Sequence, residues 1–456
     1  MTNKNTIRKI ESLIELLVMS GAYYFFWKTM IFDSDYFFPF LGRGKYILVG
    51  IYFVLNLVII HLCDGFKYGV LRMSDVLFSQ WIAIFIVNFI TYFQLCLMAN
   101  VMIPVSPLLL LTFVCWLISA VCVYIFFAIY NSKAKASKLL MVYGNRESVG
   151  LKIKMDTRAD SYNIKKIVSM SEGLDTIKEM LKDYDGLVIS DVAAKDRNDL
   201  LKYCYMHSIE TYITPKISDL IIAGGESIHQ FDTPLIMLKT GGLTPEQAFL
   251  KRFCDIVLCC FAAVVLSPLM LAVAIAIKLE DGGPVFYKQA RVTKDGAVFD
   301  ILKFRSMIVD AEAHGAQAAT DNDSRITKVG RFTRATRIDE LPQIFNIIKG
   351  DMSIVGPRPE RCEHVEKYCQ AIPEFALRNK VKGGLTGYAQ IYGKYNTSAY
   401  DKIKLDLMYI ENYSFLLDVK LVLMTIRIVF KKESTEGFDK VLSVDEILKM
   451  TESEED

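Results

Sequence analysis

The chain has 456 residues, of which 52% are hydrophobic and only 23% are charged. This composition excludes a disordered chain and points to a protein that lies partly in a bilayer. The 53 Lys and Arg residues nearly balance the 51 Asp and Glu residues, so no overall basic field exists to recruit nucleic acid. Ten cysteines without a CxxC pair argue against a disulfide scaffold and indicate reduced, buried thiols.

Four apolar runs in the first part of the chain are each long enough to cross about 30 Å of hydrocarbon. They cover Leu13–Phe32, Tyr46–Cys63, Val76–Met98 and Pro107–Tyr130. Lys and Arg residues gather before the first run, between the second and third, and after the fourth, which places both ends of the bundle in the cytoplasm. Glu15 lies near one end of its run and is expected to snorkel. The sequence thus predicts a four-helix transmembrane domain over residues 1–132.

Residues 138–223 alternate between strand and helix patterns. Strands are expected at Leu139–Tyr143, Ile167–Met170, Gly186–Ser190 and Glu210–Ile213, with helices at Ser171–Asp183 and Lys195–His207. This alternation predicts a small, doubly wound, Rossmann-like parallel sheet in the cytoplasm. Its first turn lacks the phosphate-binding pattern G-x-G-x-x-G, so we expect a structural, regulatory or oligomerising module without a cofactor. An oligomerising module would be consistent with a homodimer. A turn-rich linker, residues 224–247, contains one strand-like piece, Pro234–Leu238.

A fifth apolar run, Cys254–Ile277, has basic residues at both flanks and soluble sequence on both sides. Ser267-Pro268 divides the run, because proline removes a backbone donor and clashes with the carbonyl four residues back. Ser267 can satisfy that carbonyl. Each half, about 12 residues, rises only about 18 Å. We therefore expect a helix broken at Ser267-Pro268 that enters and leaves by the same face, with a kinked spanning helix as the alternative.

Basic and acidic residues follow one another in the next conspicuous stretch. Arg331, Arg334 and Arg337 recur every third residue and are expected to line one side of a helix. Asp339 and Glu340 come directly after, and adjacent carboxylates diverge by about 100° on a helix. One can attack phosphorus while the other holds Mg²⁺, and the arginine field should keep Asp339 ionised at neutral pH. The alternative is an ion-pair network on a solvated face.

The residues after this acid pair predict a core helix and then a rigid loop. The core positions, at helical spacing, are Leu341, Ile344, Phe345 and Ile348. Gly350 is expected to end the helix. Gly356-Pro-Arg-Pro359 fixes the backbone on both sides of Arg358, since proline holds φ near about −65°. Arg358 is therefore expected to bind an anion from a stiff support, although a plain surface turn has the same pattern.

These motifs carry a resemblance to a known family. The segment from Leu250 to Lys432 resembles the bacterial sugar transferases, which are polyprenyl-phosphate phosphoglycosyl transferases with a monotopic catalytic core. The matching motifs are Lys251 with Asp255, Ser267-Pro268, Lys303-Phe-Arg-Ser-Met307, Asp339-Glu340, Gly350-Asp-Met-Ser353 and Gly356-Pro-Arg-Pro359. The upstream spans and α/β module resemble the long form of the family, which starts capsule, exopolysaccharide or O-antigen synthesis. One departure is Lys382-Gly383, where the family usually has Arg-Pro and a stiffer loop.

The resemblance implies an activity and a role for each site residue. It implies transfer of a sugar-1-phosphate from a UDP-sugar to undecaprenyl phosphate, with release of UMP, at the cytoplasmic face of a bacterial inner membrane. Asp339 would be the nucleophile that forms a covalent intermediate, and Glu340 the ligand of Mg²⁺. The implied phosphate-binding and supporting residues are Arg334, Arg337, Arg358, Lys303 and Arg305. The catalytic domain would cover residues 248–432 and be mainly helical, anchored by a re-entrant helix at 254–277.

Two other classes of function remain as alternatives. A membrane-bound regulator would have an inactive C-terminal domain, which the intact Asp339-Glu340 pair disfavours. A transporter for lipid-linked sugars would need charges within its spans. The segment Phe415–Phe430 fits either a helix in the membrane interface or a core helix, and the acidic tail, residues 433–456, is expected to be disordered beyond Ile447. The sequence leaves the identity of the sugar open.

Overall fold

The computed structural model describes residues 2–31, 44–133, 136–158, 160–229, 232–238, 241–309, 311, 323–394 and 397–429. The acidic tail predicted at 433–456 lies outside these residues. By its internal contacts the chain divides into two compact units, one that runs from Met1 to Thr214 and one that begins at Pro215.

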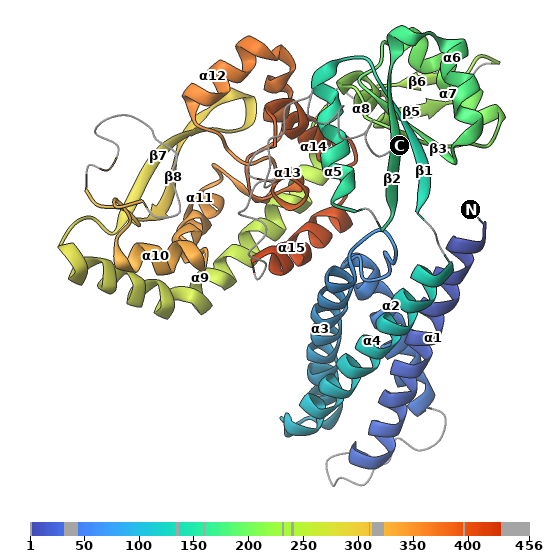
Figure 1. The fold of residues 1–456 in the computed structure, drawn as a ribbon. Helices are drawn as coiled ribbons and strands as arrows, with labels where there is room; N and C mark the ends of the chain where they lie inside the picture. Colours follow the sequence, from blue (N-terminus) through green and yellow to red (C-terminus); the bar gives the residue numbers. More distant parts are fainter. Residues whose placement is uncertain are drawn as a thin grey trace. The chain divides into compact units, whose positions relative to one another are not determined.

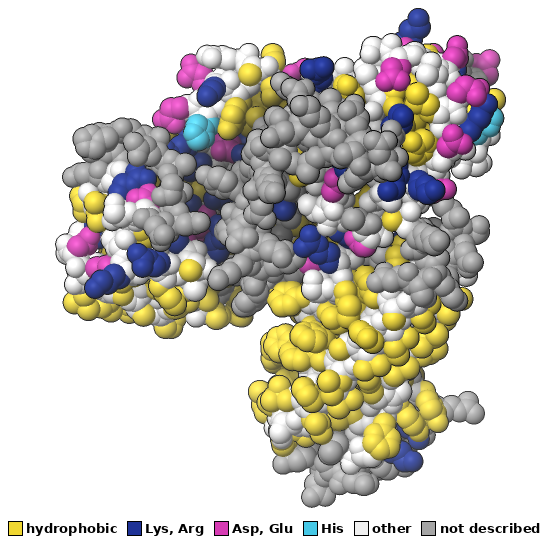
Figure 2. Space-filling model, viewed as in Figure 1, with side chains coloured by type: hydrophobic (Ala, Val, Ile, Leu, Met, Phe, Trp, Pro, Cys, Tyr) yellow, Lys and Arg dark blue, Asp and Glu magenta, His cyan; other side chains and the backbone are white. Residues whose placement is uncertain are grey.

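The first unit begins with four long helices (Figure 1). They are α1 (Thr2–Phe26, followed by a π-helical turn, Trp27–Ile31), α2 (Gly44–Leu62), α3 (Met73–Ala99) and α4 (Ser106–Lys133). Figure 2 shows apolar side chains over much of the visible face of this bundle, as lipid contact requires. Among the described residues, four helices are long and apolar enough to cross a membrane: α2, α3, α4 and, in the second unit, α9 (Pro245–Asp281). The predicted membrane character is confirmed, although α1 is less apolar than its three partners.

Glu15 of α1 does not snorkel to the surface, so that prediction is wrong. Its side chain is 1% exposed in the bundle. One carboxylate oxygen accepts hydrogen bonds from the Tyr68 hydroxyl, at 2.5 Å, and from the Gln80 amide, at 3.0 Å. The same amide also donates to the carbonyl of Gly65, at 3.1 Å. Donors from α3 and from the loop before it thus replace the water that a snorkelling carboxylate would have sought.

The rest of the first unit is an α/β layer structure. Strands β1 (Ser137–Tyr143), β2 (Tyr162–Ser169), β3 (Gly186–Ser190) and β4 (Glu210–Ile213) form one sheet in the order β2-β1-β3-β4. All its pairings are parallel, which confirms the predicted parallel sheet. Helix α5 (Leu151–Asp156) packs on one face, and helices α6 (Leu174–Met180) and α7 (Ala194–Met206) pack on the other. The central strands β1 and β3 are buried on both faces, so their sequences are largely apolar rather than alternating, whereas the outer strands β2 and β4 are only partly buried.

In its described residues the second unit is mainly helical, with three two-stranded sheets. It contains α8 (Ile217–Ala223), β5 (Glu226–Ile228), β6 (Leu235–Met237), α9, β7 (Phe286–Val292), β8 (Val298–Phe304), α10 (Lys328–Ala335), α11 (Gln343–Lys349), β9 (Ser353–Val355), α12 (Cys362–Ala371), β10 (Gly384–Thr386), α13 (Tyr388–Tyr392), α14 (Ala399–Glu411) and α15 (Phe415–Val429). In α15, Leu421 and Met424 are buried in the unit while Leu416 is 62% exposed. This helix therefore joins the core along one side and leaves apolar side chains on the other.

Helix α9 is continuous through Pro268, and Figure 1 shows that it bends along its length. The predicted break is therefore a bend. The hydroxyl of Ser267 donates to the carbonyl of Val264 at 2.7 Å, which is the carbonyl that Pro268 cannot serve. This compensation was predicted from the sequence and is confirmed. It lets an apolar helix keep its hydrogen bonds satisfied where water is scarce.

Helix α9 has a buried and an exposed side along its length. Cys259 and Ile277 pack into two hydrophobic clusters of the second unit. On the opposite side Val264 is 74% exposed and Leu279 is 82% exposed. Exposed apolar surface of this extent marks an interaction site, and for so apolar a helix the fitting environment is lipid.

Candidate functional site

The predicted acid pair lies on a short turn that follows α10. Helix α10 ends at Ala335, and Arg337 adopts a left-handed conformation with φ of 58° before the 3₁₀ turn Ile338–Glu340. Arg337 is therefore not on the helix that carries Arg331 and Arg334, so the predicted row of three arginines along one helix side is wrong. A left-handed residue other than glycine reverses the chain at some cost, and here it places the two carboxylates.

Glu340 is held by two cations. One of its carboxylate oxygens accepts a hydrogen bond from Lys303 Nζ of β8 and another from Arg358 Nη2, each at 2.9 Å. Burial alone would raise the pKa of Glu340, but the charges of Arg358 and Lys303 outweigh burial and hold this pKa far below its usual value. Glu340 is therefore ionised throughout the physiological range, and the predicted proximity of Lys303 and Arg358 to the acid pair is observed.

Asp339 has the opposite environment. Within the described part of the chain, its carboxylate has no hydrogen bond or ion pair. Burial, reinforced by the neighbouring Glu340 charge, raises the pKa of Asp339, although Lys303, Arg334 and Arg337 pull it down. The expectation that the arginine field dominates this carboxylate is therefore wrong, because partial burial outweighs the field. A carboxylate that is poorly solvated and unpaired is more basic and more nucleophilic than an ordinary one.

Arg334 and Arg337 act on Asp339 without bonding to it. Both side chains lie close enough to attract its charge, yet neither has a hydrogen bond or ion pair with any described residue. Uncommitted guanidiniums beside a free carboxylate are suited to bind an anion that the carboxylate can reach. The structure therefore brings Arg334, Arg337, Asp339 and Glu340 to one place, as the sequence predicted.

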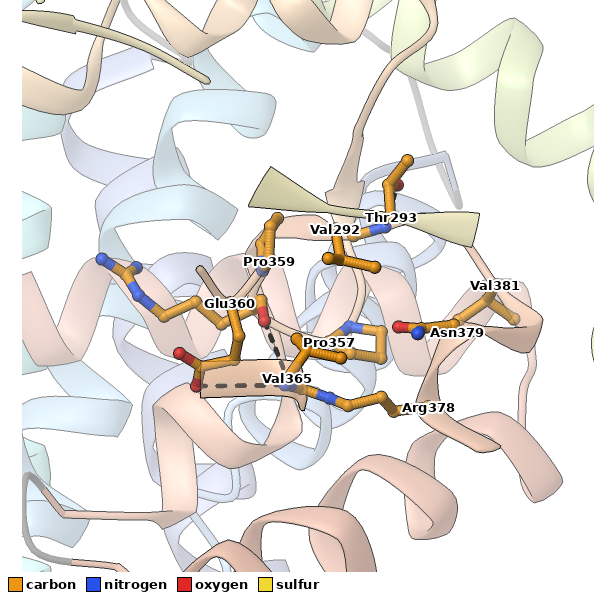
Figure 3. A pocket seen from close by; sticks show the side chains of 11 residues that line it. Val292, Thr293, Pro357, Pro359, Glu360, Val365, Arg378, Asn379 and Val381 are labelled. Carbon is orange, nitrogen blue, oxygen red and sulfur yellow. Dashed lines mark hydrogen bonds and ion pairs between the residues drawn. The ribbon is translucent and has the colours of Figure 1, made fainter. Parts of the chain in front are cut away.

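The Gly-Pro-Arg-Pro loop is stiff for a reason beyond its prolines. Its four consecutive carbonyls, Pro357 to Glu360, all accept hydrogen bonds, two of them from main-chain N–H groups of other segments. The other two donors are arginine side chains: Arg378 Nη2 donates to the Arg358 carbonyl at 2.9 Å, and Arg291 Nη1 to the Pro359 carbonyl at 3.0 Å. A pocket lies against this loop, and Figure 3 shows Arg378 and Glu360 facing each other in its wall.

Arg305 does not reach the acid pair. Its guanidinium pairs with Asp281 at the C-terminal end of α9 and is 7% exposed. Gly283 packs against this guanidinium, and a Cβ at that position would lie 2.1 Å from Arg305 Nη1, so any larger residue would have to displace the arginine side chain. The prediction that Arg305 supports the carboxylates is therefore wrong. Its ion pair with Asp281 links the end of β8 to α9 instead.

The loop with the Lys382-Gly383 departure is held by hydrogen bonds. The N–H of Gly383 donates to the Thr293 hydroxyl at 3.1 Å, and the N–H of Ser353 donates to the Gly383 carbonyl at 2.9 Å. Proline at position 383 would lack the first of these donors. The extra freedom of glycine is thus offset by one added bond.

Several functional features had no signal in the sequence. Arg378 and Asp406 are both buried and are paired across 28 positions, a separation that local patterns do not show. Arg291 had a weak signal, as a basic residue within a strand-like segment.

Phe345, predicted to be core, is 43% exposed, because α11 turns that face outward, whereas Ile344 is buried as predicted. Gly350 ends α11 in a left-handed conformation, as predicted.

Glu340 is also the candidate metal ligand. Among the described residues no group of three or more His, Cys, Asp or Glu side chains could hold a metal ion. Mg²⁺ is, however, commonly bound by one or two carboxylates together with substrate phosphates and water. The carboxylate oxygens that Lys303 and Arg358 leave open fit such a site, which a bound diphosphate would complete.

These features define a membrane-associated protein in which basic side chains surround two unlike carboxylates. Residues 246–432 match the model of the bacterial sugar transferase family. A UDP-N-acetylgalactosamine-undecaprenyl-phosphate N-acetylgalactosaminephosphotransferase of Aeromonas hydrophila is 42% identical over 252 residues, which are 54% of this chain and 59% of that protein. A UDP-glucose:undecaprenyl-phosphate glucose-1-phosphate transferase of Escherichia coli is 42% identical over 42% of this chain and 43% of its own length.

A transferase of the same name from Caulobacter vibrioides is 41% identical over 201 residues and is covered over 75% of its length. The chain therefore belongs to the bacterial sugar transferase family. Its match spans about half the length of the Aeromonas and Escherichia relatives, at 59% and 43%. The shared part contains α9, the acid pair and the Gly-Pro-Arg-Pro loop.

Proposed function

We propose that this protein transfers a sugar-1-phosphate from a UDP-sugar to undecaprenyl phosphate and releases UMP. Its relatives carry that activity in their names, with N-acetylgalactosamine in one case and glucose in the others. The observation that carries the proposal is the contrast within the acid pair: Glu340 is bound by two cations, while Asp339 is free and has a raised pKa. In such a pair one carboxylate, Asp339, can act as the nucleophile, while the other, Glu340, stays ionised and holds positive charge. The product would be the first lipid-linked intermediate of a capsule, exopolysaccharide or O-antigen.

Each residue of the site has a role in this reaction. Arg334, Arg337 and Arg358 bind the diphosphate of the donor and neutralise the charge that develops on it. Asp339 attacks the sugar-bearing phosphorus, so that a bond forms between its carboxylate oxygen and phosphorus while the bond from phosphorus to the UMP oxygen breaks. The phosphate of undecaprenyl phosphate then displaces Asp339 in a second in-line step. Lys303 fixes Glu340 throughout.

Mg²⁺ fits the same residues. Glu340, with Asp339 beside it, would hold the ion against the donor's phosphates, where it supplies charge neutralisation for the departing UMP. Arg358 and Lys303 keep Glu340 ionised and therefore able to act as a ligand at any working pH.

The membrane position of the site rests on α9. Near its N-terminus, Lys251 Nζ lies 2.5 Å from Asp418 Oδ2 of α15, and at its C-terminal end Asp281 pairs with Arg305. Both ends are thus bonded to the same unit, which supports a helix that enters the bilayer from one face and leaves by it. A crossing helix would separate these two ends by the thickness of the hydrocarbon. The active site would then lie at the cytoplasmic surface of the inner membrane, where nucleotide sugars are found.

The covalent route can be tested by trapping the intermediate. With a UDP-sugar labelled in the phosphate next to the sugar and no lipid acceptor, the wild-type chain should acquire a protein-bound label that hydroxylamine releases. Asp339→Asn should acquire none and should turn over no donor, while still binding it. A turnover-competent Asp339→Asn protein would refute the covalent route. A wild type that turns over no UDP-sugar of a panel would refute the activity itself.

The topology of α9 gives a second test. In a cysteine-free background, cysteines at Phe249 and at Leu279, which are 74% and 82% exposed, should both be labelled from the cytoplasmic side. A cysteine at Met102, in the loop between α3 and α4, should be labelled only from outside and serves as the control. Labelling of position 279 from outside would establish a crossing helix.

A further inference from the structure

The buried guanidinium of Arg378 links a remote carboxylate to the loop that carries Arg358. Arg378 lies in the 3₁₀ segment Pro373–Lys380, and its side chain is 3% exposed. Its Nε donates to Asp406 Oδ2 at 2.9 Å, and its Nη2 lies 2.8 Å from the same oxygen. Nη2 also donates to the Arg358 carbonyl at 2.9 Å. One side chain thus joins α14 to the main chain of Arg358.

This contact is the hydrogen bond that holds the Arg358 carbonyl, while other donors hold the carbonyls on either side of it. The residues on both sides of Arg358 are prolines, which have no N–H to donate, so the loop is held through its carbonyls. The side chain of Arg358 projects from the same residue to Glu340, at 2.9 Å. A shift of the Arg358 main chain would therefore move the guanidinium that faces the acid pair. A displacement of about 1 Å is enough to impair a binding or catalytic constellation.

We propose that Arg378 and Asp406 are positioning residues for Arg358, and that protonation of Asp406 loosens Arg358 and weakens binding of the donor's diphosphate. This inference rests on the proposed function, in which Arg358 binds that diphosphate. Neither residue touches the acid pair in the structure, so both act through the loop.

The titration of Asp406 falls in an accessible range. Burial raises the pKa of Asp406 to about 6, and the charge of Glu360 adds to this effect, while Arg378 and Lys402 oppose it. The other carboxylate oxygen of Asp406 is buried and has no partner among the described residues. Asp406 is thus ionised at neutral pH and protonated near pH 5. Arg378 then keeps Glu360, 3.9 Å away, as its remaining acidic partner.

The test measures donor binding in an Asp339→Asn background, which prevents turnover and removes the titration of Asp339. UDP-glucose, UDP-galactose and UDP-N-acetylgalactosamine are titrated by calorimetry into the full chain in nanodiscs between pH 5 and pH 8. Affinity for the bound donor should fall about five-fold from neutral pH to pH 5, the equivalent of roughly one lost hydrogen bond. Adding Asp406→Asn to this background should give, at every pH, the weaker affinity that the background protein shows at pH 5. Adding Arg378→Lys should also weaken binding, because lysine cannot bridge Asp406 and the carbonyl as a planar fork does.

Two matched controls separate this role from general destabilisation. Asp418→Asn removes another buried ion pair of the same unit, with Lys251, and should leave both affinity and its pH dependence unchanged. His364 lies 4.0 Å from Glu360, and His364→Gln should leave the pH dependence in place. If Asp406→Asn does not fold, Lys402→Gln replaces it. Loss of the Lys402 charge should move the midpoint of the affinity change to higher pH.

The outcomes are distinct. A pH dependence that survives Asp406→Asn, or that does not move with Lys402→Gln, overturns the inference. Donor affinity that is the same at pH 5 and at neutral pH overturns it as well. A background protein that binds none of the three donors at any pH overturns the proposed function and removes the diphosphate that Arg358 would hold.

Discussion

Buried carboxylates of this protein are stabilised in two ways, by neutral donors and by cations. In the helical bundle, Glu15 accepts hydrogen bonds from neutral donors, the Tyr68 hydroxyl and the Gln80 amide. In the second unit, Asp418 is paired with Lys251 and Glu340 with Lys303. Asp339 belongs to neither pattern, because it is partly buried and has no bonded partner among the described residues. An uncompensated group of this kind is costly, and its persistence marks the reactive position.

The largest effect is expected where a buried ion pair is broken. Lys251→Met leaves Asp418, whose side chain is 13% exposed, without its cation. We expect a loss of about 3 kcal/mol in the free energy of unfolding. The double variant Lys251→Met with Asp418→Leu should recover most of this loss, since no charge is left buried. Thermal unfolding in detergent micelles would measure both. Equal losses in the single and double variants would contradict the ion-pair account.

A smaller loss is expected at Glu340. Glu340→Gln leaves Lys303 and Arg358 without their shared anion, but Arg358 is 40% exposed and can find water. We therefore expect a loss of about 2 kcal/mol, below that of a fully buried pair. The folded-state pKa of Glu340 lies below the unfolded value of 4.5, so this stability is present above pH 4.5 and lost as pH falls below it. The variant should lack that acid-dependent loss, and its turnover should fall together with its response to Mg²⁺.

Asp339→Asn should do the reverse and stabilise the protein. The folded state raises the pKa of Asp339, so ionisation costs stability as pH rises from the unfolded value of 3.8 through the folded one. Removing the charge should therefore raise the free energy of unfolding at neutral pH, by roughly 0.5–1 kcal/mol, while turnover is lost. The gain should disappear below about pH 4, where both side chains are neutral. Unfolding curves at pH 4 and pH 7 would decide this, and a variant less stable than wild type at pH 7 would show that Asp339 has a partner that stabilises it.

The sequence predicted elements that are governed by local chemistry. Strand β3, Gly186–Ser190, was predicted at its observed bounds, because a short apolar run between turn residues is typical of a buried strand. Ser267 was predicted to compensate for Pro268, since the two are adjacent. The row of three arginines failed at Arg337, because left-handed backbone at an arginine has no composition signal.

What local patterns miss is the choice of partner across the fold. Glu15 was expected at the surface because the Tyr68 and Gln80 donors come from distant positions. Arg305 was expected beside Lys303, yet the two point to different partners, Asp281 and Glu340. Residues two apart in a strand share a face, but Arg305 lies just beyond the end of β8, where that alternation no longer applies.

The smallest loss of stability is expected for the conservative substitution Glu15→Gln, which tests the carboxylate that neutral donors hold. The two hydrogen bonds go to one carboxylate oxygen, and the other oxygen has no partner among the described residues. Glu15→Gln keeps an acceptor for both donors, so stability should change by less than about 1 kcal/mol. Glu15→Leu removes the acceptor and leaves the proton of the buried Tyr68 hydroxyl unpaired, while the Gln80 amide keeps the Gly65 carbonyl, so the loss should be about 1–3 kcal/mol. Unfolding of both variants in detergent micelles would compare them. A Gln variant as unstable as the Leu variant would mean that the bundle needs the negative charge of Glu15 itself.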